Sequence, residues 1–364
     1  MIIGLISDKV WFWGGRRRPF VLIGGVLAAG MLLALPNIDG IAASFGFTGL
    51  LGVAIAVALT LDLAINISFN PTRSIIADVT PEGTERTKGY TWMQTISGFF
   101  GVLAYLVGAV FGNYILIGVG VAIVFLFSFV PMFFITERRE STAAVAAAAG
   151  AAPVQSKTEW GQLFRIYFAH GFSWIGIQTM FVYIIAFIQQ KYFMAGAEQE
   201  LIDAQSGRII AIAFAILNTV GFILPAFVLE PIVERIGRVK THILCVAFMS
   251  AGYFGIVLFG QTPMILYILM AVAGIGWAAV VSLPFAIMTE KVDQSRTGFF
   301  MGIFNLSVVL PQLFVSLALG TIIKNAMDKN IIFMISGISL AVSAVLWILV
   351  KEKRIINVKT NSNT

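Results

Sequence analysis

The sequence is poor in the residues that build soluble catalytic and metal sites. Its 364 residues include one cysteine and two histidines, which excludes a disulfide framework and leaves too few ligands for a clustered metal site. Charged residues make up only 12%, about half the share that is usual in soluble domains. P-loop, HExxH and nucleophile-elbow motifs are all missing from the sequence, so we expect neither an enzyme nor a bound cofactor.

Long hydrophobic runs take the place of charge. Hydrophobic residues make up 59% of the chain, and ten runs approach the roughly 20 residues that a helix needs to cross a bilayer. An all-α membrane protein follows, because open strands cannot satisfy their backbone groups in lipid. The expected spans are 19–36, 48–69, 90–112, 114–135, 166–190, 209–228, 241–260, 263–288, 299–323 and 331–350.

Lysine and arginine lie mainly in alternate loops, beginning with the run Arg16–Arg18. The opposite loops hold only Lys191, Arg208, Lys324 and Lys329. By the positive-inside rule the richer side is cytoplasmic, and both chain ends are expected there. The net charge of +6 therefore indicates topology, and nucleic-acid binding is not expected.

An alanine-rich stretch within residues 136–164 separates four spans from six and has the composition of a tether. We predict an N-terminal bundle at 1–135, a cytoplasmic linker at 136–164, a C-terminal six-helix bundle at 165–350 and a cytoplasmic tail at 351–364. The opening MIIGLI is expected to be the end of a helix. If both bundles have six spans, the first helix and most of the second are missing from this chain.

One acidic residue, Asp62, interrupts the second expected span. An ionised carboxylate at mid-bilayer costs roughly 2.5–3.5 kcal/mol, so it is expected to face a cavity. On a helix, Asn66, Asn70 and Arg73 lie about 40°, 80° and 20° around the axis from Asp62. Arg73 is also about 16 Å further along, so the two charges are expected to act separately. The competing interpretation is that Asp62 fixes helix packing and Arg73 reaches the interface.

Polar and aromatic residues in later spans are candidates for substrate contact, since sugar sites combine ring stacking with hydroxyl-binding groups. The candidates, with Asn66 and Asn70, are Trp174, Gln178, Tyr183, Asn305 and Gln312. For each of them, packing in the core is the alternative.

Charged residues at the expected cytoplasmic helix ends are candidates for a gate. They are Asp8, Arg16, Arg17, Arg18, Asp78, Glu290 and Arg296. We expect them to form a latch that stabilises the outward-facing state. The alternative is a set of charges that only sets topology.

Several motifs stand out along the chain. They are the loop GLISDKVWFWGGRRRPF, the segment LDLAINISFNPTRSIIAD, and the runs FSWIG, SLPFAI and GIFNLSVVLPQ. The loop resembles the signature between the second and third helices of the major facilitator superfamily. The segment matches the pattern D-L-A-x-N-x(4)-P-x-R-x(3)-A-D of plant carriers in its glycoside and sucrose-transporter branch, which the three runs resemble as well.

The resemblance implies two pseudo-symmetric bundles and proton-coupled transport of a sugar, with Asp62 as the protonatable group and Arg73 as its partner. Plant carriers have acidic residues shortly after the aromatic motif, whereas the run IQTMFVYIIAF has none. This favours a bacterial inner-membrane carrier of maltose, sucrose or another disaccharide, expected to be monomeric. A sodium-coupled glycoside carrier, a non-transporting sugar sensor and an inactive fragment remain open.

Overall fold

The computed structural model describes residues 2–46, 50–137, 158–193 and 198–352, and the regular elements in these ranges are helices. Eight described segments are long and apolar enough to cross a membrane, by length and composition. They are Arg18–Ser44, Leu50–Val79, Tyr114–Phe134, Trp160–Tyr192, Gln199–Ile236, Arg238–Phe259, Pro263–Thr289 and Gln294–Asn325. The prediction of an all-α membrane protein is confirmed.

The other two expected spans, 90–112 and 331–350, coincide with the helices α5 (Thr84–Phe111) and α16 (Ile331–Trp347). Most helices extend beyond the expected spans. For example, α8 (Trp160–Tyr192) covers the expected 166–190 and part of the predicted linker. A hydropathy pattern detects the apolar middle of a helix but not its polar ends, because polar turns outside the hydrocarbon are as helical as the rest.

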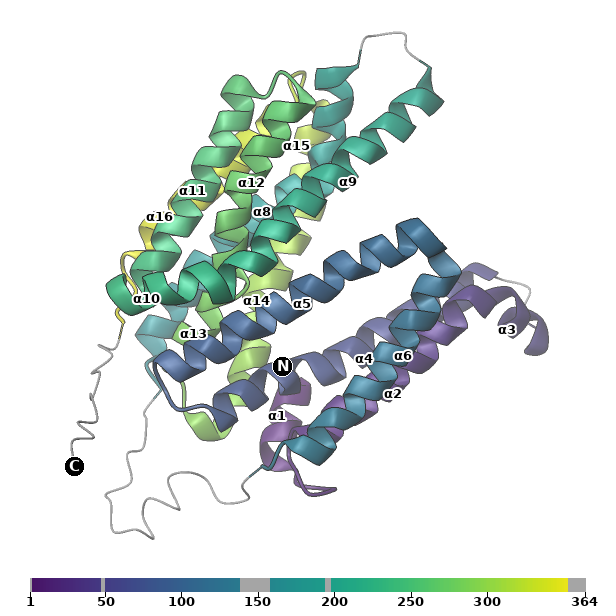
Figure 1. The fold of residues 1–364 in the computed structure, drawn as a ribbon, viewed down its shortest axis with the longest axis vertical. Helices are drawn as coiled ribbons and strands as arrows, with labels where there is room; N and C mark the ends of the chain where they lie inside the picture. The colour runs from purple at the N-terminus through teal and green to yellow at the C-terminus, as the bar shows by residue number, and fades with distance from the viewer. Residues whose placement is uncertain (1, 47–49, 138–157, 194–197, 353–364) are drawn as a thin grey trace. The chain divides into compact units, whose positions relative to one another are not determined.

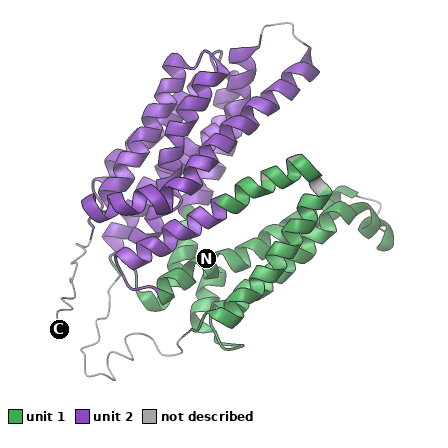
Figure 2. Ribbon diagram, in the orientation of Figure 1, with its two compact units in different colours: residues 1–79, 99–158, 291–306 green, residues 80–98, 159–290, 307–364 purple. Residues whose placement is uncertain are grey.

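The chain divides into two compact units, which Figure 2 shows in two colours. Unit 1 comprises 1–79, 99–158 and 291–306, and unit 2 comprises 80–98, 159–290 and 307–364. The units depart from the predicted bundles because α5 and α14 (Thr297–Phe314) each contribute one half to each unit. Most of the predicted linker and tail lies outside the described residues.

Unit 1 is built around α2 (Arg18–Ala34), which packs against α4 (Leu50–Val79) and α6 (Asn113–Phe134), as Figure 1 shows. Gly24 allows this approach, since a Cβ there would lie 2.7 Å from the carbonyl oxygen of Ala64. The short elements of unit 1 are α1 (Ile2–Lys9), η1 (Leu35–Asn37), α3 (Ile38–Ser44) and η3 (Gln294–Arg296).

Unit 2 contains long helices that pack in the order α8, α16, α11, α12, α9. These are α9 (Gln199–Leu224), α11 (Arg238–Phe259) and α12 (Pro263–Val280), with α8 and α16. The fully buried Ile177, Met249 and Leu340 are among the side chains that fill the core between them. The shorter elements are η2 (Pro225–Leu229), α10 (Glu230–Ile236), α13 (Leu283–Thr289), η4 (Val315–Leu319) and α15 (Gly320–Asn325).

The span expected at 263–288 is two helices, since α12 ends at Val280 and α13 begins at Leu283. The break comes just before Pro284, which has no N–H to donate and whose ring would clash with the carbonyl of Val280 in a continuous helix. At the break, Ser282 Oγ donates to the carbonyl oxygen of Ala278 at 2.6 Å. Two further spans each contain one π-helical turn: η2 lies in Gln199–Ile236 and η4 in Gln294–Asn325.

Candidate functional site

Asp62 lies on the face of α4 that points away from α2. Ala64 is fully buried against α2, and two residues on a helix are separated by about 200° around the axis. Asp62 is accordingly exposed on unit 1, where Asn66 Nδ2 donates to Asp62 Oδ2 at 3.3 Å and to its carbonyl oxygen at 2.9 Å. Among the described residues, no cation pairs with the Asp62 carboxylate. The structure therefore brings Asp62 and Asn66 together, as the sequence predicts.

The remaining members of the predicted stripe lie further along the same helix, which continues through Pro71. The Asn70 side chain is buried, and its Oδ1 atom accepts no hydrogen bond within the described residues. The Arg73 guanidinium lies 3.7 Å from the ring centroid of Phe69. Arg73 and Asp62 are thus not joined by an ion pair, in keeping with their predicted separation.

Trp174 belongs to an aromatic cluster in unit 2. Its Nε1 donates to His170 Nε2 at 2.9 Å, and its ring centroid lies 6.0 Å from that of Trp277 in an edge-to-face arrangement. Phe181 also contacts Trp277, at 5.3 Å. His170 fixes the Trp174 ring, so this part of α8 offers a rigid apolar surface.

The other substrate candidates are distributed over both units. Tyr183 Oη donates to the carbonyl oxygen of Val315 at 3.2 Å, where the π-helical turn η4 begins. Gln178 is half-buried on α8. Asn305 and Gln312 are half-buried on α14, but Asn305 belongs to unit 1 and Gln312 to unit 2.

Arg17 is the centre of a charge cluster in unit 1. Its guanidinium is fully buried and lies 2.5 Å from Asp8 Oδ1 and 3.1 Å from Asp78 Oδ2. Arg17 Nη1 also donates to Ser7 Oγ at 2.6 Å, and Arg16 pairs with Asp78 at 3.0 Å. Burial opposes the charge of Arg17, but Asp78 and Asp8 outweigh it and raise its pKa above the ordinary value. We call these five residues the first charge cluster.

Asp8 connects the first charge cluster to the beginning of α14. Its two carboxylate oxygens accept hydrogen bonds from the backbone N–H groups of Gly298 and Phe299, at 2.9 and 2.7 Å. These are orphan donors at a helix N-terminus, where a negative charge is stabilised. Gly4 and Gly298 permit the contact, because a Cβ on either one would overlap the backbone of the other.

Sequence reasoning missed Glu137, which lies just after the fourth expected span, 114–135. Its carboxylate accepts hydrogen bonds from three successive backbone N–H groups, those of Arg16, Arg17 and Arg18, at 2.8 to 3.1 Å. Arg18, a predicted gate residue, lies 3.5 Å from Glu137 through its Nε. The signal that could have found it was an acidic residue just after a span, on the same expected side of the membrane as the run Arg16–Arg18.

Arg238 is the centre of a second charge cluster, which lies in unit 2. Its Nη1 and Nη2 donate to Glu290 at 2.6 and 2.7 Å, and its Nε donates to Glu352 at 2.9 Å. Glu290 also accepts the backbone N–H of Gly83 at 2.6 Å, ahead of α5. Glu352 in turn accepts the backbone N–H groups of Arg238 and Val239. We call Arg238, Glu290 and Glu352 the second charge cluster.

The two clusters repeat one arrangement. In each, a buried arginine at the start of a helix pairs with a carboxylate later in the chain: Arg17 with Asp78, 61 residues later, and Arg238 with Glu290, 52 residues later. A second carboxylate accepts backbone N–H groups at the start of the same helix. It is Glu137, 120 residues after Arg17, and Glu352, 114 residues after Arg238. Such a correspondence is the pseudo-symmetry that the sequence predicts between the two halves.

Arg296, another predicted gate residue, lies over the rings of Phe299 and Phe300, at 4.7 and 5.8 Å from their centroids. A pair that was not predicted joins α5 to α10, where Lys88 Nζ lies 3.4 Å from Glu230. Within the described ranges, no three His, Cys, Asp or Glu side chains gather as a metal site would require.

Long apolar helices of this number and length define a multi-pass membrane protein. The sequence profile of the Major Facilitator Superfamily matches residues 1–316 and 206–362, so the chain belongs to that superfamily. The predicted superfamily membership is thus confirmed.

Similar proteins come from both sequence and structure. The sucrose transport protein SUC4 of Arabidopsis thaliana is 21% identical over 376 residues, which cover 88% of this chain and 73% of the relative. The E. coli fucose:proton symporter FucP aligns with a TM-score of 0.68 and 11% identity over 97% of this chain and 87% of its own. The proton:xylose symporter XylE aligns with a TM-score of 0.64 and 15% identity over 96% and 83%. At these identities, the structural likenesses show the fold alone.

Proposed function

We propose that the chain is a proton-coupled symporter of a sugar, with a disaccharide as the substrate and Asp62 as the proton-binding group. The similar proteins named above include a sucrose transport protein and two proton symporters of monosaccharides. The sucrose transport protein, a relative by sequence, supports the class of solute, and the residues of this chain supply the mechanism.

The observation that carries the proposal is the environment of Asp62. Its carboxylate is on an apolar helix, faces away from the packed side of unit 1, and has an amide rather than a cation beside it. Asp62 is exposed on unit 1 and no cation pairs with it among the described residues, so within an apolar span only water and Asn66 offset the charge that proton binding would remove. Asn66 can donate to the ionised carboxylate, and its amide can accept from the protonated form. Asp62 can therefore alternate between both forms in place.

Symport then requires linkage between the proton and the sugar. A ligand shifts a conformational equilibrium only by its differential affinity for the two states. If protonated Asp62 and bound sugar favour the same state, each increases the affinity for the other by the same factor. In this mechanism the Trp174 ring stacks on the sugar, and Gln178 and Gln312 are candidate partners for its hydroxyl groups. Arg73 tunes the charge along α4 without pairing with Asp62.

The first charge cluster acts as a latch in this proposal. Asp8 holds the beginning of α14 by two backbone hydrogen bonds, and Arg17 holds Asp8. Any state in which α14 moves away from α1 exposes these donors and the buried guanidinium. The latch therefore favours one transport state over the other.

The test is uptake of radiolabelled sucrose and maltose into proteoliposomes. Wild-type protein is expected to accumulate one of them when the outside is acidic, with or without sodium, and to lose accumulation with a protonophore. Asp62→Asn keeps the shape but cannot ionise, so it should lose accumulation and retain equilibrium exchange of labelled for unlabelled sugar. Asp39→Asn, at an exposed aspartate on α3, is the matched control and should behave as wild type. Undiminished accumulation by Asp62→Asn would refute the assignment.

A further inference from the structure

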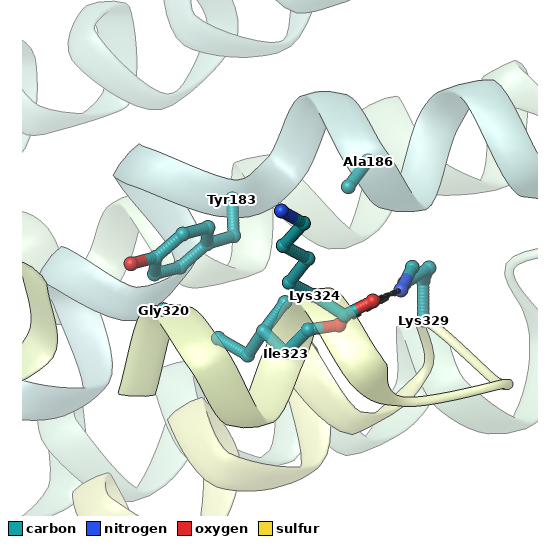
Figure 3. A pocket seen from close by; sticks show the side chains of 6 residues that line it. All are labelled: Tyr183, Ala186, Gly320, Ile323, Lys324 and Lys329. Carbon is teal, nitrogen blue, oxygen red and sulfur yellow. Dashed lines mark hydrogen bonds between the residues drawn. The ribbon is translucent and has the colours of Figure 1, made fainter. Parts of the chain in front are cut away.

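Unit 2 contains a cavity that the transport proposal does not use. Its volume is about 360 Å³, within the range of small-ligand pockets. It lies between α8 and α15, and Figure 3 shows the side chains that line it. These are Tyr183, Ala186, Gly320, Ile323, Lys324 and Lys329.

Two of the polar groups at this cavity are already engaged. Lys329 Nζ donates to the carbonyl oxygens of Ile323, Lys324 and Ala326, at 2.8, 3.1 and 2.7 Å, and thereby caps α15. The Tyr183 hydroxyl donates to the carbonyl oxygen of Val315. Gly320 leaves room for this hydroxyl, since a Cβ there would lie 2.9 Å from it.

Lys324 is different. Its side chain extends from α15 toward α8 and ends between Tyr183 and Ala186 (Figure 3). Within the described residues, its ammonium group has neither a hydrogen bond nor a carboxylate partner. The cavity thus has one available positive charge above walls formed by a tyrosine ring and small or aliphatic residues.

The residues that line the cavity favour a ligand that has an anionic group attached to an apolar chain. A neutral sugar needs acceptors as well as donors, whereas ammonium groups only donate and no carboxylate or amide lines the cavity. Two lysines also disfavour a metal cation. A phosphate oxygen would instead form a charge-assisted hydrogen bond with Lys324, while the attached carbon chain could lie against Ile323 and the Tyr183 ring.

The position along the helix agrees with this chemistry. Lys324 is next to the end of the apolar segment Gln294–Asn325, which is the depth at which lysine side chains meet lipid headgroups. Lys191 ends α8 and provides a second lysine near a helix end, but it does not line the cavity. Lys324 is itself exposed, so an anion can reach its ammonium group from outside the protein.

We propose that this cavity binds a phosphate-bearing anion through Lys324, and that the apolar walls favour an anionic phospholipid headgroup over free phosphate. Because Lys329 and Tyr183 are held by backbone carbonyls, the cavity is preorganised. A bound phospholipid would contact both α8 and α15 and stabilise their packing.

The experiment measures the thermal midpoint of the purified full-length chain in detergent as dioleoyl-phosphatidylglycerol is added. Dioleoyl-phosphatidylcholine, which has no net charge, corrects for general effects of lipid, and inorganic phosphate and glycerol 3-phosphate test the free anion. Phosphatidylglycerol is expected to raise the midpoint beyond phosphatidylcholine. A similar rise with inorganic phosphate or glycerol 3-phosphate alone would support the site with a free anion as its ligand.

Variants assign the effect to the cavity. Lys324→Gln should raise the half-saturating concentration of phosphatidylglycerol roughly tenfold, the factor for 1.4 kcal/mol, which is the low end for a hydrogen bond to a charged group. Lys191→Gln is the matched control and should leave that concentration unchanged. Ala186→Phe fills the cavity, keeps both lysines, and should abolish the specific rise.

Equal effects of Lys324→Gln and Lys191→Gln would overturn the proposal, as would a rise that is the same for both lipids. Lys324→Gln changes a side chain without partners, so this arm remains decisive even if Ala186→Phe does not fold. The measurement is independent of sugar uptake, so it can fail or succeed separately from the proposed transport function.

Discussion

Replacement of Arg238 by methionine should destabilise unit 2 strongly, because this side chain neutralises two carboxylates at once. It donates two hydrogen bonds to Glu290 and one to Glu352. The exposed fractions of the Arg238 and Glu290 side chains are 1% and 3%, against 19% for Glu352. Methionine keeps the length of the aliphatic stem and removes only the guanidinium.

The magnitude follows from what the change leaves behind. Glu290 keeps the N–H of Gly83 but loses its cation, and an unpaired buried charge of this kind costs about 3–5 kcal/mol. About 1 kcal/mol shifts the thermal midpoint of a body of 150–250 residues by about 2–4 °C. The midpoint should therefore fall by roughly 6 °C or more. Adding Glu290→Gln should restore part of it, because the amide still accepts from Gly83 and carries no charge.

A natural probe for this assay is Cys245. It is the single cysteine of the chain and lies buried on α11, the helix that Arg238 begins. A thiol-reactive dye that fluoresces on coupling therefore reports the opening of this helix as the temperature rises. Arg235→Met is the matched control, because Arg235 is exposed and three residues away.

Equal midpoints for Arg238→Met and Arg235→Met would show that the second charge cluster does not hold unit 2 together. A double variant that is no more stable than Arg238→Met alone would refute the explanation by an unpaired charge at Glu290.

Three further predictions concern other contacts. Arg17→Met should lower the free energy of unfolding by a similar amount at pH 7 and at pH 10. The pKa of Arg17 is raised in the folded state, so the stability that its charge contributes is complete below the ordinary pKa. That stability is lost only as the pH rises through the pKa of the folded state. Lys88→Gln should cost at most about 1 kcal/mol, because the pair with Glu230 is partly exposed, and a double-mutant cycle with Glu230→Gln should give a coupling energy no larger than that. Gly176→Ala should lower the thermal midpoint, at a cost of about 1–3 kcal/mol, since its Cβ would lie 2.6 Å from a backbone oxygen of α16; Gly161→Ala, which meets open space, should not lower it.

The sequence predicts the helices well because their apolar runs are long and uniform. It also places Asp62 and Asn66 on one face, since a four-residue spacing on a helix is set by geometry alone. The pairing of Arg17 with Asp8 and Asp78 agrees with the predicted gate residues, although the closure of a gate by these contacts stays a prediction.

The missed contacts have a common cause. Glu137 and Glu352 bind backbone N–H groups, and because every residue except proline has one, the sequence does not mark which of them a carboxylate will bind. Pro284 indicates that the span 263–288 can break, but the sequence does not place the break after Val280, because the residues on both sides are apolar. Long-range partners such as Lys88 and Glu230 require knowledge of which helix ends meet, and hydropathy does not contain it.

The position of Glu137 has a consequence for how this region can vary. Its three donors end at Arg18, and Pro19, the next residue, has no N–H to offer. A shift of the loop by one residue toward the C-terminus would replace the last donor with the tertiary amide nitrogen of Pro19, which carries no hydrogen. The starting point of the helix is thus fixed by covalent chemistry, because the contacts of Glu137 require that none of the three donor residues be proline.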